Sequence, residues 1–235
     1  MMSGAFNLNM IRFQGEIFLS RSGILRNFIY SLKSQSWQNR DVIDCLISMR
    51  TIVSDGTRLS TEYYDYFEEC MESFLDSYRT RSGRTLSDEA RLVASNSCFV
   101  PFLYSAELFD GDFKAKYILD LGCGSSSRNE RTFSSAMFCP WFCRLLAYLG
   151  ADAIGIDIGD NSSEPFRNYQ RDLAIRGSLD VIPDSSIDIV VAQQFFSSPY
   201  MQNTLNYNPM EVKNLLLPQI GRVLKEDGCY LLLDY

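Results

Sequence analysis

Apolar residues are spaced differently in the two halves of the chain. In the first half they recur at helical intervals, over residues 24–32 and 41–49 and most clearly in a stretch that begins at Ser60 or Thr61. A further helix is expected over residues 87–108, interrupted near Pro101. We therefore expect residues 1–110 to form a helical N-terminal region.

Short apolar runs alternate with amphipathic stretches from Tyr117 onward. The helices are expected to run from Pro140 to Gly150 and from Asn208 to Gly228, the second kinked at Pro218. The strands are expected over residues 117–120, 151–158, 166–171, 187–192 and 229–235. Alternating strands and helices predict a parallel sheet with right-handed crossovers. Residues 111–235 are therefore expected to form a single α/β domain.

A glycine pair follows the first of these strands. Asp120 ends the strand, and Gly122, Cys123 and Gly124 lead into three serines. Open α/β sheets bind nucleotide-like ligands at the carboxyl ends of their strands, and glycine lets the main chain approach a ligand closely. We therefore expect free backbone N–H groups to face a ligand at this turn. The polar stretch 125–135 is long enough to be a functional loop.

Two carboxylates follow the next two expected strands. Asp157, at the end of the second strand, is suited to accept hydrogen bonds from both hydroxyls of a ribose. Asp172, after the third strand, is suited to accept a hydrogen bond from an exocyclic amine, and Ile158 and Leu173 are suited to enclose a purine. These residue types in this order favour an adenosine ligand. Asp188 is interpreted instead as a structural carboxylate.

The composition of the chain excludes several kinds of catalytic and binding site. The chain of 235 residues contains no histidine, which excludes histidine-based general bases, catalytic triads and metal ligands. Its seven cysteines include no CxxC pair and are interpreted as buried thiols in a reducing compartment, so no metal site is predicted. A net charge of −7 argues against binding to nucleic acid or to an anionic membrane. No apolar segment is long enough to span a membrane, and a cytoplasmic location is expected.

Five segments in order strengthen the adenosine interpretation. They are Ile118-Leu-Asp-Leu-Gly-Cys-Gly124, Ile154-Gly-Ile-Asp157, Arg171-Asp-Leu173, residues 182–191 and residues 221–228. The series resembles the motifs of class I S-adenosylmethionine-dependent methyltransferases and covers residues 115–235. The resemblance implies that S-adenosyl-L-methionine is the cofactor. By that resemblance Asp120, Gly122, Cys123 and Gly124 lie against its methionine part, Asp157 holds the ribose, Ile158, Asp172 and Leu173 contact the adenine, and Gln193 lies near the reacting methyl group.

The same resemblance implies a Rossmann-like fold, with a mostly parallel sheet of strand order 3-2-1-4-5 flanked by helices. Family members continue with two more strands, one of them antiparallel, whereas the fifth expected strand here ends at Tyr235. An open strand edge promotes association. We expect this edge to be covered by the N-terminal segment, by a second copy in a homodimer or by a partner protein.

The resemblance implies a methyltransferase, and a small-molecule acceptor is expected. Residues 192–196, Ala-Gln-Gln-Phe-Phe, lack the Asn/Asp-Pro-Pro-aromatic motif of many family members that methylate amino groups in nucleic acids and proteins. No catalytic residue is identified, and carboxylates and tyrosines are the candidates for any base. Phe133, Trp141, Phe195 and Phe196 are candidates for an acceptor site and equally for the core.

Two other functions stay open. An NAD-dependent oxidoreductase would need a third glycine in the turn and an acidic residue about 20 positions further on. Ser127 stands where the third glycine is needed, and Asp157 lies well beyond that distance from Gly122. The other alternative is a non-catalytic or partner-dependent methyltransferase-like module, which the absent terminal strands and the absence of histidine favour.

Overall fold

The computed structural model describes residues 10–13, 16–19, 61–83, 85–126, 136, 138–196, 198 and 200–233. The helices expected over residues 24–32 and 41–49 lie outside this part of the chain. So do Phe133 and most of the polar stretch 125–135.

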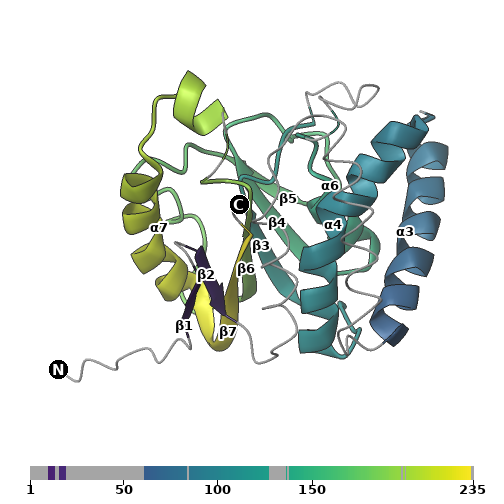
Figure 1. The fold of residues 1–235 in the computed structure, drawn as a ribbon, viewed down its shortest axis with the longest axis horizontal. Helices are drawn as coiled ribbons and strands as arrows, with labels where there is room; N and C mark the ends of the chain where they lie inside the picture. The colour runs from purple at the N-terminus through teal and green to yellow at the C-terminus, as the bar shows by residue number, and fades with distance from the viewer. Residues whose placement is uncertain are drawn as a thin grey trace.

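A seven-stranded sheet forms the centre of the molecule (Figure 1). Five of its strands are parallel and lie in the order β5-β4-β3-β6-β7, which is 3-2-1-4-5 when they are counted along the chain. The expected α/β class and strand order are thereby confirmed. These strands are β3 (Tyr117–Leu121), β4 (Asp152–Asp157), β5 (Arg167–Gln170), β6 (Ile187–Gln193) and β7 (Leu224–Leu233).

Each face of the sheet has its own apolar core. Alternate residues of a strand point to opposite faces, so that in β3 Ile118 packs into one core while Leu119 and Leu121 pack into the other. All three side chains are fully buried. A strand covered on both faces is apolar throughout rather than alternating, which is why β3, β4 and β6 appear in the sequence as short, mostly apolar runs.

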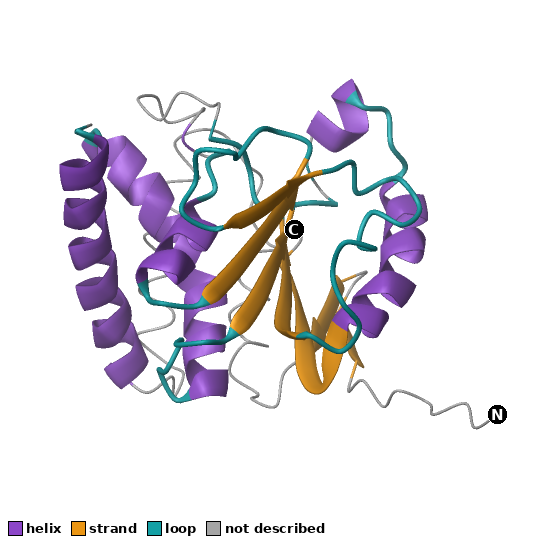
Figure 2. Cartoon of the chain, turned by 180° about the vertical axis from the view of Figure 1, so that it is seen from behind, coloured by secondary structure: helices purple, strands orange, loops and turns teal. Residues whose placement is uncertain are grey.

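Helices cover both faces of the sheet (Figures 1 and 2). On one side α6 (Trp141–Tyr148) packs against β4, α4 (Asp88–Phe109) lies beside α6, and α3 (Thr61–Ser82) forms the outermost layer. On the opposite side lies α7 (Pro209–Val223), whose first turn is capped by Asn208 as the sequence predicts. Among the described residues, no helix combines the length and apolar character that a membrane span needs.

Two helices differ from the prediction. α4 runs through Pro101 without the expected interruption, because Phe99 and Phe102 on either side of the proline are buried in the core. That packing outweighs the loss of one backbone donor. α7 ends at Val223 rather than at Gly228, because Leu224 already pairs with Ile187 as the first residue of β7.

An antiparallel hairpin from the N-terminal region extends the sheet. β1 (Met10–Phe13) pairs with β2 (Glu16–Leu19), and β2 pairs with β7. The expectation of a helical N-terminal region was therefore wrong for these two segments. In the sequence, two runs of strand-forming residues stand on either side of Gln14-Gly15, a pattern typical of a hairpin. The N-terminal segment thus covers the β7 edge, while a homodimer or a partner protein stays a prediction.

Candidate functional site at the carboxyl ends of the strands

The turn after β3 has a backbone conformation that favours glycine. Gly122 and Gly124 have φ angles of +71° and +91°, which place a strain on any residue that carries a Cβ. A Cβ on Gly124 would also overlap the carbonyl group of Phe138. The prediction of a glycine-dependent turn at the end of the first central strand is confirmed.

The N–H groups of this turn all donate to acceptors within the protein. The acceptors are the Ile156 carbonyl for Gly122 and Cys123, the Asp157 carboxylate for Gly124, the Phe138 carbonyl for Ser125 and the Asn161 side chain for Ser126, at 2.8 to 3.4 Å. The expectation of free N–H groups facing a ligand was therefore wrong. The physical reason is that β4, the loop after it and the segment before α6 place acceptors within hydrogen-bond distance of these N–H groups.

Asp157 joins the turns that follow β3 and β4. Its Oδ2 accepts a hydrogen bond from the N–H of Gly124 at 3.0 Å, and its Oδ1 accepts one from the N–H of Gly159 at 2.7 Å. Each carboxylate oxygen has two lone-pair directions, so both can still accept a hydrogen bond from a ligand hydroxyl. The carboxylate is partly exposed at the end of β4.

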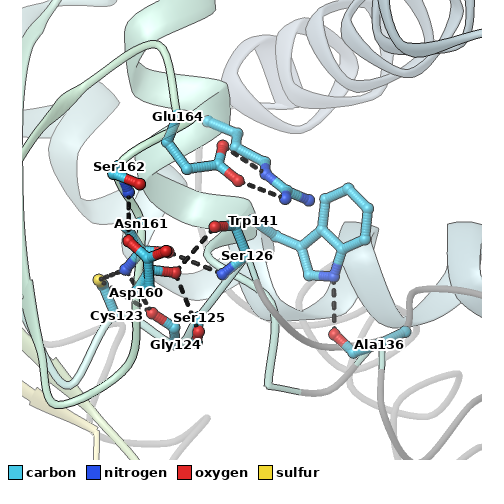
Figure 3. Close-up of polar contacts among 11 residues, drawn as sticks. Cys123, Gly124, Ser125, Ser126, Ala136, Trp141, Asp160, Asn161, Ser162 and Glu164 are labelled. Atoms are coloured by element: carbon cyan, nitrogen blue, oxygen red, sulfur yellow. Dashed lines mark hydrogen bonds and ion pairs between the residues drawn. The ribbon is translucent and has the colours of Figure 1, made fainter.

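Asn161 makes a second connection between the same two turns (Figure 3). Its buried side chain accepts from the N–H of Ser126 at 2.8 Å and donates to the Gly124 carbonyl at 2.8 Å. The hydroxyls of Ser125 and Ser126 donate to the Asp160 carbonyl. Asn161 was not predicted from the sequence, because an asparagine four positions after a strand carries no signal of its own.

Asp120 lies beneath the glycine turn rather than at the surface. Its side chain is only 5% exposed and accepts a hydrogen bond from the Cys143 thiol of α6 at 3.6 Å. Burial, together with the charge of nearby Asp157, raises the pKa of Asp120 to about 7, although the hydrogen bond from Cys143 acts in the opposite direction. Burial also raises the pKa of the Cys143 thiol, which keeps that thiol a hydrogen-bond donor.

The predicted purine residues lie at the edge formed by β4 and β5. Ile158 is 38% exposed and directly follows the buried strand β4. Asp172 follows β5 and accepts a hydrogen bond from the hydroxyl of Tyr207 at 2.6 Å. Leu173 is buried in the core on the α7 side rather than exposed. The sequence analysis did not identify Tyr207.

Gln193 is the last residue of β6, next to the glycine turn. The preceding residue, Ala192, pairs with Leu121, the residue before Gly122. The ring of Phe195 rests on Gly122, where a Cβ would come within 2.5 Å of ring atom Cδ2. Gly122 therefore leaves room for an aromatic side chain, and the ring, Gln193 and the turn lie together.

A buried ion pair anchors the loop after β4 (Figure 3). Arg144 of α6 donates to both carboxylate oxygens of Glu164, at 2.9 and 2.6 Å, and its guanidinium stacks on the rings of Tyr78 and Trp141. Trp141 is 1% exposed and donates to the Ala136 carbonyl. Of the aromatic residues proposed for an acceptor site, Trp141 and the equally buried Phe196 therefore belong to the core.

Asp188 has a structural role, as the sequence analysis proposed. It accepts hydrogen bonds from the N–H of Tyr117 and from the ammonium group of Lys225, both at 2.8 Å. These partners lie where β3 and β7 begin, away from the glycine turn. Asp188 is therefore not part of the candidate site.

Comparisons with known protein families and with curated proteins found no match. The chain matches no model of a known protein family, and no curated protein shows significant similarity to it. Within the described part of the chain, no group of cysteines and carboxylates is arranged to hold a metal ion.

Proposed function

We propose that this protein binds S-adenosyl-L-methionine and transfers its methyl group to a small-molecule acceptor. One observation carries the proposal: Asp157 ends β4, Asp172 follows the adjacent parallel strand β5, and the exposed Ile158 lies next to Asp157. Adenosine presents two ribose hydroxyls, an apolar ring and an exocyclic amine. Two hydrogen-bond acceptors and an apolar surface at one sheet edge suit these groups.

The chemistry of these side chains fits such a cofactor. Asp157 is held by two main-chain N–H groups and keeps acceptor capacity for the ribose hydroxyls. Asp172 is held by the hydroxyl of Tyr207 and by the N–H of Ala174 at 2.9 Å, and keeps capacity for an amine. S-adenosylmethionine supplies a methyl group already activated by a sulfonium. Placement of the acceptor then matters more than acid–base catalysis, which suits a chain without histidine.

We assign the residues at the end of β6 to the part of the site where the methyl group is transferred. Gln193 and Phe195 lie beside the glycine turn, and the Phe195 ring lies against Gly122. The side-chain amide of Gln193 offers both a donor and an acceptor for orienting an acceptor molecule. We assign positioning roles to these residues and no acid–base step.

Binding of a nicotinamide dinucleotide is disfavoured by the turn itself. Dinucleotide-binding turns direct backbone N–H groups at a pyrophosphate. Here the N–H groups from Gly122 to Ser126 all have protein acceptors. A cofactor without phosphate does not need those donors.

Calorimetric titration of the protein with S-adenosylmethionine, S-adenosylhomocysteine and NAD tests the proposal. We expect both sulfur compounds to bind and NAD not to bind. Asp157→Asn should weaken binding by about tenfold or more, because the charge is lost and one of the two acceptor oxygens is replaced by an NH₂ group that cannot accept a hydrogen bond. Asp110→Asn is the matched control: it removes a carboxylate from an exposed left-handed position at the end of α4, which asparagine tolerates. A folded protein that binds neither sulfur compound contradicts the proposal.

A non-catalytic module is the second candidate, and the position of Phe195 favours it. A ring that rests directly on Gly122 covers the turn against which the methionine part is expected to lie. Incubation with methyl-labelled cofactor and fractions of small-molecule extract, followed by measurement of S-adenosylhomocysteine, separates the two functions. Cofactor binding without any transfer would identify the module.

A further inference from the structure

Tyr207 connects two parts of the molecule that are not neighbours in the sheet. It lies between the π-helical turn η1 (Tyr200–Thr204) and α7, in the segment that follows β6. Its hydroxyl donates to Asp172, which follows the edge strand β5. Strands β3 and β4 separate β6 from β5 in the sheet. The contact is therefore a tertiary link across the candidate site.

The tyrosine is held from both sides along the chain. Its N–H donates to the Met201 carbonyl at 3.1 Å, and the next residue, Asn208, caps α7 by accepting from the N–H of Met210 at 3.0 Å. Its partly buried side chain packs against the core on the α7 side. These contacts hold the phenol of Tyr207 in place without a bound ligand.

The direction of the hydrogen bond follows from charge. The bond to Asp172 raises the pKa of the Tyr207 phenol above its ordinary value of 10, so the phenol keeps its proton at neutral pH and donates it to the carboxylate. A separation of 2.6 Å is typical of an O–H donor and an ionised acceptor. With the N–H of Ala174 on the other oxygen, both donors fix the carboxylate plane.

Asp172 lies beside the corner formed by Asp157 and Ile158. The N–H of Arg171 donates to the Asp157 carbonyl at 2.8 Å, and the side chain of Gln170 donates to the Ile158 carbonyl at 3.0 Å. A carboxylate fixed next to this corner presents only acceptors to a ligand. The hydroxyl of Tyr207 already donates its single proton to Asp172, so it cannot also donate to an acceptor atom of a ligand at this position.

We propose that Tyr207 is a positioning residue that makes Asp172 select a purine with an amino group at position 6 over one with an oxo group. This inference rests on the proposed function. An amine donates to the fixed carboxylate, whereas an oxo group brings a second acceptor against it and is repelled. Without the phenol the carboxylate can turn away, so the oxo compound is excluded less strongly.

The test compares the affinities of S-adenosylhomocysteine and S-inosylhomocysteine, its 6-oxo analogue, by calorimetry. The native protein should bind the adenosyl compound at least tenfold more tightly. Tyr207→Phe should lower that ratio by about threefold to tenfold, the value of one hydrogen bond. Tyr117→Phe, which removes a phenol where β3 begins, at the other end of the sheet, should leave the ratio unchanged.

Asp172→Asn supplies a second variant if Tyr207→Phe fails to fold. Its amide oxygen would keep the hydrogen bond from the N–H of Ala174, and its NH₂ group would donate to the Tyr207 hydroxyl. The position would then lose its charge and one acceptor, and the preference for the adenosyl compound should fall. An unchanged ratio in folded Tyr207→Phe, or an equal loss of affinity for both compounds, overturns the selective role while the proposed function stands. A native protein that binds neither compound overturns the proposed function as well.

Discussion

At the scale of single residues, the buried carboxyl group of Asp120 links stability to pH. The pKa is raised from an ordinary value of 3.8 to about 7 in the folded protein. Between these values the folded state keeps a proton that the unfolded state releases. The free energy of unfolding therefore falls as pH rises through this window, and the loss is complete above pH 7.

Asp120→Asn should remove this pH dependence. Above pH 7 the variant avoids the free-energy cost of ionising a buried carboxyl group. The size of the pKa shift sets an upper limit of about 4 kcal/mol on this cost. Denaturant unfolding of native protein and variant at intervals between pH 4 and pH 8 measures it. The variant should gain stability relative to the native protein as pH rises, while Asp110→Asn should follow the native curve. Parallel curves for Asp120→Asn would show that the carboxyl group is ionised in the fold.

Gly122 and Gly83 allow conformational strain to be separated from steric overlap. Both have positive φ, but a Cβ on Gly83 meets nothing within 4 Å, whereas one on Gly122 meets the Phe195 ring at 2.5 Å. Gly83→Ala should cost about 1 kcal/mol, the conformational term alone. Gly122→Ala should cost clearly more, and Phe195→Ala in the same chain should recover part of the difference. Equal costs in thermal unfolding would mean that the ring moves aside freely.

At the scale of elements, much of the fold was predictable and the connections between elements were not. Local patterns of apolar, proline and capping residues predict the strand from Tyr117 and the helix capped by Asn208. Asn161 and Tyr207 act on residues 35 or more positions away, through contacts that exist only after the sheet has formed. No local pattern reports such a partner. The same reason explains the error about free N–H groups, whose acceptors lie on β4 and on two loops that are distant in the sequence or come together only in the fold.

The Arg144–Glu164 pair is the element-scale contact with the largest expected effect. It joins α6 to the loop after β4, and the two side chains are 4% and 7% exposed. Breaking a buried ion pair by removing one charge costs about 3–5 kcal/mol, because the remaining charge stays buried. Glu164→Gln should lower the free energy of unfolding by that order and loosen the loop that carries Gly159 and Asn161.

The exposed pair between Arg222 and Asp184 is the matched control. The Asp184 side chain is 73% exposed, and pairs of this kind contribute less than about 1 kcal/mol. Asp184→Asn should therefore change stability far less than Glu164→Gln in the same denaturant titration. Hydrogen exchange should report faster exchange in residues 158–164 only for Glu164→Gln. A similar small effect of both variants would show that water reaches the Arg144 pair.

At the scale of the whole molecule, the sheet links the two terminal regions of the described chain. β7 is the last described strand and β2 comes from the first described segments, yet the two are paired, with Phe18 opposite Leu231. β7 also pairs with β6, whose last residue is Gln193. The hairpin β1–β2 thereby supports, through β7, the strand that ends beside the glycine turn. Pairing of the N-terminal hairpin with β7 is therefore expected to affect both the stability of the fold and the position of Gln193.

Deletion of residues 2–20 should expose the β7 edge. An unpaired strand edge presents a row of N–H and C=O groups that pair readily with another chain. We expect size-exclusion chromatography with light scattering to show dimers or larger assemblies, and thermal unfolding to occur at a lower temperature. A shorter deletion, of residues 2–9, keeps both hairpin strands and should behave as the full chain does. If the longer deletion yields a monomer of unchanged thermal stability, the hairpin does not protect the edge, and a partner protein becomes the better candidate to cover it.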